Sequence, residues 1–261
     1  TEEAAEKSGR PRLDMGLSDN VSYTYNPNAE RGNRIVDIKI NGESVDPDKD
    51  YTVAASTFLL DGGDALINKD EVRDRNDVGY NDLQAFVDYL QSGEAKVRAG
   101  QKDVGVVLPE GGLKAGQKNT ITLTSLSYSS EGEPQAKTVT VKIGDTTVTA
   151  DVDNAVTDAD KGYGEQGRAT VTIELPEDVY KDENLVITTD AGTEISMPVE
   201  IEGGKERPAN QGGANGGSSI SAGALVLGIL SLVGLGSILA IVFGPQLHAI
   251  LGPIAHVGNH R

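Results

Sequence analysis

The most constraining feature of this 261-residue sequence is a stretch without charge, residues 220–243, built mainly from Leu, Val, Ile, Ala and Gly. As an α-helix these 24 residues would measure about 36 Å, enough to cross a hydrocarbon core of about 30 Å. A buried core helix is the alternative, but such helices seldom run so long without a polar edge. We therefore predict a single transmembrane helix over residues 220–243. A Gly-, Asn-, Ser- and Gln-rich linker at 204–219 would precede it, and a short tail at 244–261 would follow.

Charge divides the chain in the same way. It carries 40 acidic and 23 basic residues, a net charge of −17, and no charged residue lies between Arg207 and Arg261. This acidity argues against a nucleic-acid partner, which needs clustered Lys and Arg. Arg261, as the basic group after the span, favours a cytoplasmic tail by the positive-inside rule. We expect a single-pass protein of the cell membrane whose soluble part is extracellular.

Histidine and cysteine are almost absent. The chain has no Cys, and its 3 His residues are His248, His256 and His260. The first 247 residues therefore hold no thiol nucleophile, His base, Ser-His-Asp triad or His-ligated metal. Only carboxylates and carbonyls remain there as ligands, and these bind hard cations.

The first soluble region, residues 1–100, alternates short strand patterns with one helix. Alternating apolar residues predict strands over 21–25 and 36–40, and Asn41-Gly42 is a strong hairpin signal. A further strand is expected over 51–56, running on into 58–60. Apolar residues at 83, 86, 87 and 90 lie on one face of a helix that Asn81 or Asp82 would cap and Gly93 would end. This order predicts an α+β domain.

The sequence Asp61-Gly62-Gly63-Asp64 lies between that last strand and a polar run. Paired glycines allow positive φ angles and let a ligand approach the backbone closely. From these residues alone, a plain tight turn and a ligand-binding loop both remain open.

Five sequence blocks in this region resemble the C-terminal domain of the 5'-nucleotidase family. In order along the chain they are LSDNVSYTY at 17–25, GNRI at 32–35, ING at 40–42, YTVA at 51–54 and FLLDGGD at 58–64. The resemblance covers about 80 residues, and the helix with Asp82 and Tyr89 is similar as well.

The resemblance implies a nucleoside-binding domain that follows a two-metal phosphoesterase domain. The family's GGDG-aromatic loop stacks a ring on the base, so Gly62, Gly63, Asp64 and Leu66 are the implied substrate-binding residues. Leu66 stands where the family has Phe or Tyr, which weakens the expectation of nucleobase specificity. A nearby acidic group contacts the ribose in the family; Asp70, or Glu71 beside it, is a loose match.

The family's metal-binding motifs lie upstream of the residues present here. The implied divalent metal ions, which would generate and orient the attacking water, therefore belong to a missing upstream domain. We expect no cofactor and no catalytic residue in this chain, and no activity of the chain alone.

The second soluble region, residues 101–203, contains about seven short Thr-, Val- and Ile-rich runs, over 104–108, 120–126, 137–143, 146–152, 168–175, 185–189 and 194–201. Turn signals separate them. This pattern predicts an all-β immunoglobulin-like sandwich without the antibody disulfide. Such modules often follow surface enzymes in actinobacteria, so the arrangement fits a bacterial cell-surface protein, and a spacer role is the default.

Acidic residues crowd one connection of this sandwich, namely Asp151, Asp153, Asp158 and Asp160, with Glu165 nearby. A weak calcium site is one interpretation, because Ca2+ prefers several carboxylates on a flexible turn. Their spacing does not match the twelve-residue EF-hand loop, and an acidic solvated loop is the alternative.

Two functions follow from these observations. The first is the substrate-binding part of a membrane-anchored extracellular hydrolase of the 5'-nucleotidase type, which takes a nucleotide or nucleoside as its small-molecule partner. The second is a non-catalytic surface adhesion or interaction protein with a degenerate nucleotidase-like domain, which Leu66 supports best.

Overall fold

The structure is a computed structural model that describes residues 15–97, 100–130, 132–157 and 165–208. The predicted transmembrane span and tail, and the linker from residue 209 onward, lie outside these ranges. Within them, no helix is long and apolar enough to cross a membrane. The described residues fall into two compact units. The loop unit contains 15–21 and 39–86, and the sandwich unit contains 22–38 and 87–208.

The predicted hairpin at Asn41-Gly42 is confirmed. Strand β2 (Ile35–Ile40) pairs antiparallel with β3 (Glu43–Ser44), with Ile40 opposite Glu43. Asn41 and Gly42 have φ angles of 54° and 83°. A two-residue loop with both φ angles positive matches the right-handed twist of its strands, and Asn-Gly is the pair that accepts this geometry most easily.

The strand predicted over residues 51–56 is wrong. These residues form no regular element, and α2 (Thr57–Leu60) begins directly after Ser56. Tyr, Thr and Val favour a pleated surface, but β-propensity is realised only where a neighbouring strand takes the backbone hydrogen bonds. The short 3-10 helices η1 (Gly63–Ala65) and η2 (Lys69–Glu71) follow α2.

The predicted helix is present as α3 (Asp82–Gln91). Asn81 caps it, because its side-chain oxygen accepts a hydrogen bond of 3.2 Å from the Gln84 amide. Gly93 follows with a φ of 76°, the left-handed conformation that commonly ends a helix. The apolar face is present but uncovered among the described residues: Leu83 is 68% exposed and Phe86 59%.

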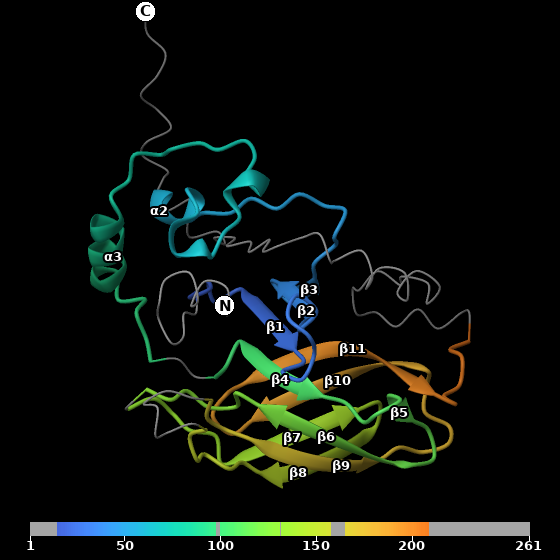
Figure 1. Cartoon of the computed structure of the whole chain (residues 1–261). Coiled ribbons are helices and arrows are strands. Elements are labelled where there is room, and N and C mark those ends of the chain that lie inside the picture. The colour runs from blue at the N-terminus through green and yellow to red at the C-terminus, as the bar shows by residue number, and fades with distance from the viewer. Residues whose placement is uncertain (1–14, 98–99, 131, 158–164, 209–261) are drawn as a thin grey trace, which may run out of the picture. The chain divides into compact units, whose positions relative to one another are not determined.

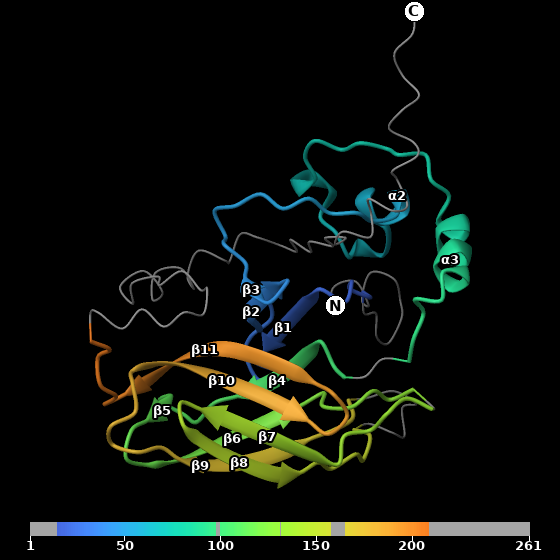
Figure 2. The ribbon, with the colours of Figure 1, turned by 180° about the vertical axis from the view of Figure 1, so that it is seen from behind.

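The sandwich unit contains the seven strands predicted for residues 101–203 (Figures 1 and 2). They are β4 (Asp103–Val107), β6 (Lys118–Thr124), β7 (Thr138–Ile143), β8 (Thr146–Asp151), β9 (Ala169–Glu174), β10 (Asp182–Thr189) and β11 (Glu194–Glu202). A short β5 (Leu113–Lys114) was not predicted. One sheet has the order β3-β2-β1-β4-β6-β9, and the other β5-β11-β10-β7-β8.

The core of this unit lies between its two sheets. β9 alternates buried and exposed side chains along its whole length, and most of β11 does the same. Twenty of the described residues form one apolar cluster to which β4, β6, β7, β9, β10 and β11 all contribute. The period-two pattern is what a strand needs to bury one face. The mostly-sheet content is therefore confirmed, whereas the immunoglobulin-like assignment stays a prediction.

The first sheet also contains a strand from far upstream. β1 (Val21–Tyr25) lies between β2 and β4 and pairs with β4 in parallel, with Tyr23 opposite Asp103 and Tyr25 opposite Gly105. Both β1 and most of β2 group with the sandwich unit. Local patterning does not indicate this pairing, and the predicted domain boundary at residue 100 stays a prediction.

Candidate functional site

The glycine pair of the predicted ligand loop follows a single capped helical turn. The Ser56 hydroxyl accepts a hydrogen bond of 3.4 Å from the Leu59 amide at the start of α2. The Gly62 amide donates to the Leu59 carbonyl at 3.0 Å, which closes the turn. Gly62 has a φ of 86°, a left-handed conformation that glycine adopts without the steric cost of a Cβ atom. The chain therefore reverses at Gly62.

Gly63 must be glycine for a different reason: an aromatic ring lies against its backbone. A Cβ atom at Gly63 would lie 2.5 Å from the Phe58 carbonyl oxygen and 2.6 Å from two carbons of its ring. No side chain fits at such distances, so the Phe58 ring lies directly against the Gly63 backbone. Phe58 is nevertheless 58% exposed. The loop therefore presents an aromatic surface beside its glycines.

The residues after the glycine pair stay in the left-handed region. Asp64 and Ala65 have φ angles of 53° and 52°. Such angles are uncommon for residues with a Cβ atom and cost of order 1–3 kcal/mol each. Backbone strain of this kind is a reason to test the loop for ligand binding.

The structure distinguishes among the predicted substrate-binding residues by their exposure. Gly62, Gly63 and Asp64 are half-buried within one tight loop. Leu66 is only 6% exposed, so the side chain in the expected stacking position packs inward. Asp70 is exposed, and its amide donates to the side chain of Asn68 at 3.2 Å.

The sequence pattern does not single out Phe58 as a candidate ligand contact, and it offers Glu71 only as the alternative to Asp70. Phe58 belongs to the family-like block, but its role depends on the ring lying against Gly63, a contact that no sequence pattern signals. Glu71 is half-buried; its Oε1 accepts a hydrogen bond of 3.0 Å from Asn68, while its Oε2 is buried without a hydrogen-bond partner among the described residues.

An ion pair flanks the loop. Arg75 donates a hydrogen bond of 2.5 Å to Asp61, the residue directly before Gly62. This hydrogen bond raises the pKa of Arg75, with the charge of Asp61 as the second cause. Both side chains are well exposed, so the pair adds little stability. The positive charge of Arg75 does, however, partly neutralise the negative charge of Asp61 beside the glycine pair.

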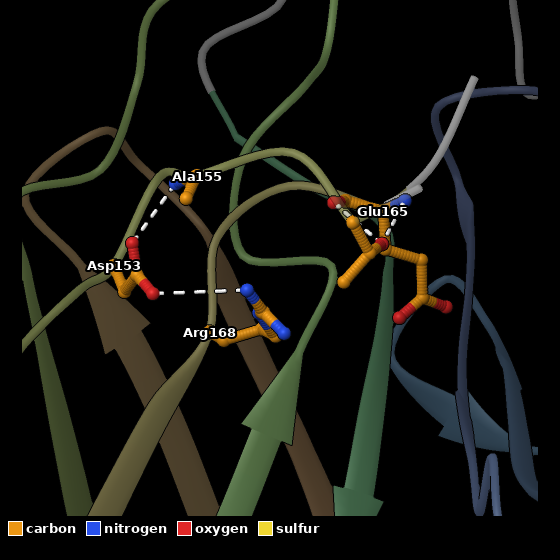
Figure 3. A network of polar contacts seen from close by, with 5 residues as sticks. Asp153, Ala155, Glu165 and Arg168 are labelled. Atoms are coloured by element: carbon orange, nitrogen blue, oxygen red, sulfur yellow. Dashed lines mark hydrogen bonds and ion pairs between the residues drawn. The ribbon is translucent and has the colours of Figure 1, made fainter. Parts of the chain in front are cut away.

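In the described part of the acidic connection, the Asp153 carboxylate and the Glu165 backbone make contacts within the connection (Figure 3). Asp153 accepts a hydrogen bond of 2.9 Å from the Ala155 amide and lies 3.7 Å from the Arg168 guanidinium. Glu165 holds the other end of the connection through Thr157 and accepts from Tyr25. Asp151 is exposed, and Asp158 and Asp160 lie outside the described residues. No group of three potential ligands is arranged for a metal in the described ranges, and calcium binding stays a prediction.

Comparison with protein families agrees with the sequence resemblance. Residues 2–69 match the family described as "5'-nucleotidase, C-terminal domain". This segment of the chain is therefore similar to the C-terminal domain of the 5'-nucleotidase family. The match includes Phe58, both loop glycines and Leu66, and it ends at Lys69, before Asp70, Glu71 and α3. A search of curated proteins found no match.

Proposed function

We propose that this chain is the substrate-binding part of a 5'-nucleotidase-like hydrolase that acts on extracellular nucleotides. The observation that carries the proposal is the loop at Gly62-Gly63 within the matched segment, with the exposed Phe58 ring against it. An open aromatic face beside a close backbone approach suits a planar, partly apolar ligand such as a nucleobase.

The positions of Phe58, Leu66 and Glu71 suggest which part of a nucleoside each could contact. Phe58 offers the stacking surface that Leu66, packed inward, does not. Glu71 is the candidate for the ribose hydroxyls because its buried Oε2 has no partner among the described residues, and a ligand would reach it only after a local opening of the loop. A buried acceptor without a partner is costly, and a ligand hydroxyl would remove that cost.

Catalysis requires residues that the chain lacks. A di-metal phosphoesterase site is built from His and carboxylate clusters, and the first 247 residues contain no His. The first 247 residues therefore lack the His ligands that such a metal pair needs. Phosphoester hydrolysis would therefore reside in an upstream domain of the parent protein. That parent should hydrolyse nucleotides only with divalent metal and lose activity on chelation.

The proposal includes a cell-surface location. Residues 220–243 would anchor the protein as a single-pass membrane helix, with an immunoglobulin-like sandwich and linker holding the substrate-binding part outside the cell. Protease added to intact cells should then remove the soluble part. Protection of the soluble part in intact cells would argue against the proposed orientation.

The inward-packed Leu66 favours a second function, a surface adhesion protein whose nucleotidase-like domain no longer binds a nucleoside. The two functions differ in one measurement. Titration of the chain with adenosine and with AMP, followed by calorimetry or ligand-observed NMR, should show binding if the loop is functional. A chain that binds no nucleoside or nucleotide would favour the adhesion function.

Comparing the variants Phe58→Ala and Phe86→Ala tests whether the ligand binds at the loop. The two rings are equally exposed, at 58% and 59%, but only Phe58 lies against Gly63. Loss of base stacking costs about 1–3 kcal/mol, so Phe58→Ala should weaken binding by between about fivefold and about 150-fold. Phe86→Ala should leave it unchanged. Equal effects of the two variants would show that the loop is not the site.

A further inference from the structure

Strand β4 of the sandwich pairs with β1, a strand from near the start of the described chain. β1 pairs in parallel with β4, and the Tyr23 amide donates to the Lys102 carbonyl at 2.8 Å. Parallel strands need a long crossover, and here the whole of residues 26–102 lies between them. β1 belongs to the segment that matches the nucleotidase family, whereas β4 lies beyond it. The pairing therefore joins two regions that the sequence presents as separate.

Tyr25 makes this pairing specific. Its hydroxyl donates to Glu165 Oε1 at 2.8 Å and lies 2.7 Å from Ser125 Oγ. Because the phenol has one proton, the Ser125 hydroxyl must donate to the Tyr25 oxygen. The two partners lie 100 and 140 residues away in sequence. A hydrogen bond to a charged group is about twice as strong as a neutral one. An extended segment without this hydroxyl would leave both partners unsatisfied.

The sandwich side is shaped to receive the tyrosine. Gly105 lies opposite Tyr25 in the register, and a Cβ atom there would collide with the Thr124 hydroxyl and lie 3.1 Å from the Tyr25 ring. Ser125 has a φ of 58°, an uncommon conformation for a residue with a Cβ atom. The space for the Tyr25 ring therefore depends on the absence of a side chain at Gly105 and on the left-handed backbone at Ser125.

A catalytic role for these three residues does not fit. Burial raises the pKa of Tyr25 from 10.0 to about 12, so its hydroxyl stays protonated and cannot serve as a base toward Ser125. A neutral donor held between a carboxylate and a hydroxyl is instead what a structural contact needs.

We propose that the β4 edge, together with Ser125 and Glu165, is a docking surface for a parallel strand carrying a tyrosine, and that its occupant is the Val21–Tyr25 strand of the same chain. The sandwich then holds the β1 part of the family-matched segment non-covalently and is more than a passive spacer. This inference is independent of nucleotide binding, and its test does not read out a ligand.

The test uses the full chain in mild detergent with a protease site inserted into the exposed stretch 73–80. After cleavage, the fragment that carries β1 should co-elute with the fragment that carries the sandwich in gel filtration. Tyr25→Phe should raise the dissociation constant of the two fragments at least tenfold, since a hydrogen bond to a carboxylate is lost. Gly105→Val, made in the other partner, should have the same or a larger effect.

Tyr51→Phe is the matched control. It removes a hydroxyl from the same fragment, but among the described residues that hydroxyl accepts from the nearby Asp46 amide, at 2.9 Å, and not from the sandwich. Its dissociation constant should equal that of the parent chain. Fragments that separate on cleavage of the parent, or that stay associated equally well with Tyr25→Phe and Gly105→Val, would overturn the proposal. An uncut chain that runs as a dimer by light scattering, and separates on Tyr25→Phe, would assign the occupant to a second copy instead.

Discussion

The sandwich unit and the loop unit are stabilised by different means. Twenty apolar residues of the sandwich unit form one cluster, and several, including Val104, Ile121 and Leu185, are fully buried. Among the described residues of the loop unit, the buried apolar residues are Val21, Ile40, Leu66 and Ile67. A region with so little buried surface gains little from the hydrophobic effect, which scales with the apolar area removed from water.

Local devices take the place of a core in the loop unit. Ser56 caps α2, and Asn81 caps α3, whose residues from Val87 onward group with the sandwich unit. Glycines such as Gly62 and Gly42 have left-handed φ angles, and Arg75 pairs with Asp61. Each device contributes about 1 kcal/mol or less. Binding loops are drawn from the less stable parts of proteins. The contrast therefore agrees with a ligand-binding role for the loop unit and a supporting role for the sandwich.

The largest expected effect compares the same substitution in a buried strand and on an exposed helix. Leu185 in β10 is fully buried, whereas Leu83 on α3 is 68% exposed. Leu185→Ala should lower the free energy of unfolding of the sandwich by about 2–5 kcal/mol, because it leaves a cavity in a packed core. Leu83→Ala should change stability by less than about 0.5 kcal/mol. Urea unfolding of both variants measures the difference.

A large loss of stability in Leu83→Ala would break the comparison. It would show that the apolar face of α3 is covered in the intact protein, so the helix has a partner beyond the described residues. An equally small effect of Leu185→Ala would mean that the core can collapse around a missing side chain. Either outcome would remove the contrast between the two units.

The sandwich strands were predictable because their signal is local. Strict alternation along β9 and β11 marks one buried face, and turn residues separate the runs. The loop glycines were equally predictable from their sequence motif, and α3 from the helical spacing of its apolar residues. The strand expected over 51–56 failed because its residues favour a sheet but have no neighbouring strand. The β1–β4 pairing was not predictable, since nothing near Tyr25 in the sequence points to Ser125 or Glu165. For the same reason the exposed Phe58 emerged only with its position against Gly63.

An intermediate effect is expected at high pH, and it concerns the contact that ties β1 to the sandwich. Burial raises the pKa of Tyr25 from 10.0 to about 12. Between these values the unfolded chain releases this proton while the folded chain keeps it, so the folded state binds more protons. Stability from this group is therefore complete below pH 10 and falls as the pH rises toward 12, by about 2 kcal/mol.

Tyr25→Phe isolates that contribution. The variant should be less stable than the parent at pH 8, because it lacks both hydrogen bonds, and the gap should narrow as the pH rises through 10 to 12. Tyr89→Phe, which removes a hydroxyl from a residue that is 50% exposed on α3, is the control and should be as stable as the parent at pH 8. Unfolding in urea at a series of pH values measures all three. A gap that stays constant would show that the Tyr25 hydroxyl ionises freely in the folded protein and is not held by Glu165.

The smallest effect is expected at the start of α3, and it tests whether this helix depends on its cap. The Asn81 side chain accepts from the Gln84 amide, and the helix buries none of its side chains among the described residues. Asn81→Ala should cost about 1 kcal/mol of local helix stability. Because the core does not depend on the cap, hydrogen exchange should speed up about fivefold in α3 while the amides of β10 keep their rates. Gln91→Ala, at the last position of the helix, is the control and should leave both sets of rates unchanged. Faster exchange in β10 after Asn81→Ala would mean that α3 and the sandwich unfold together, so the division into a core-stabilised and a locally stabilised unit would fail.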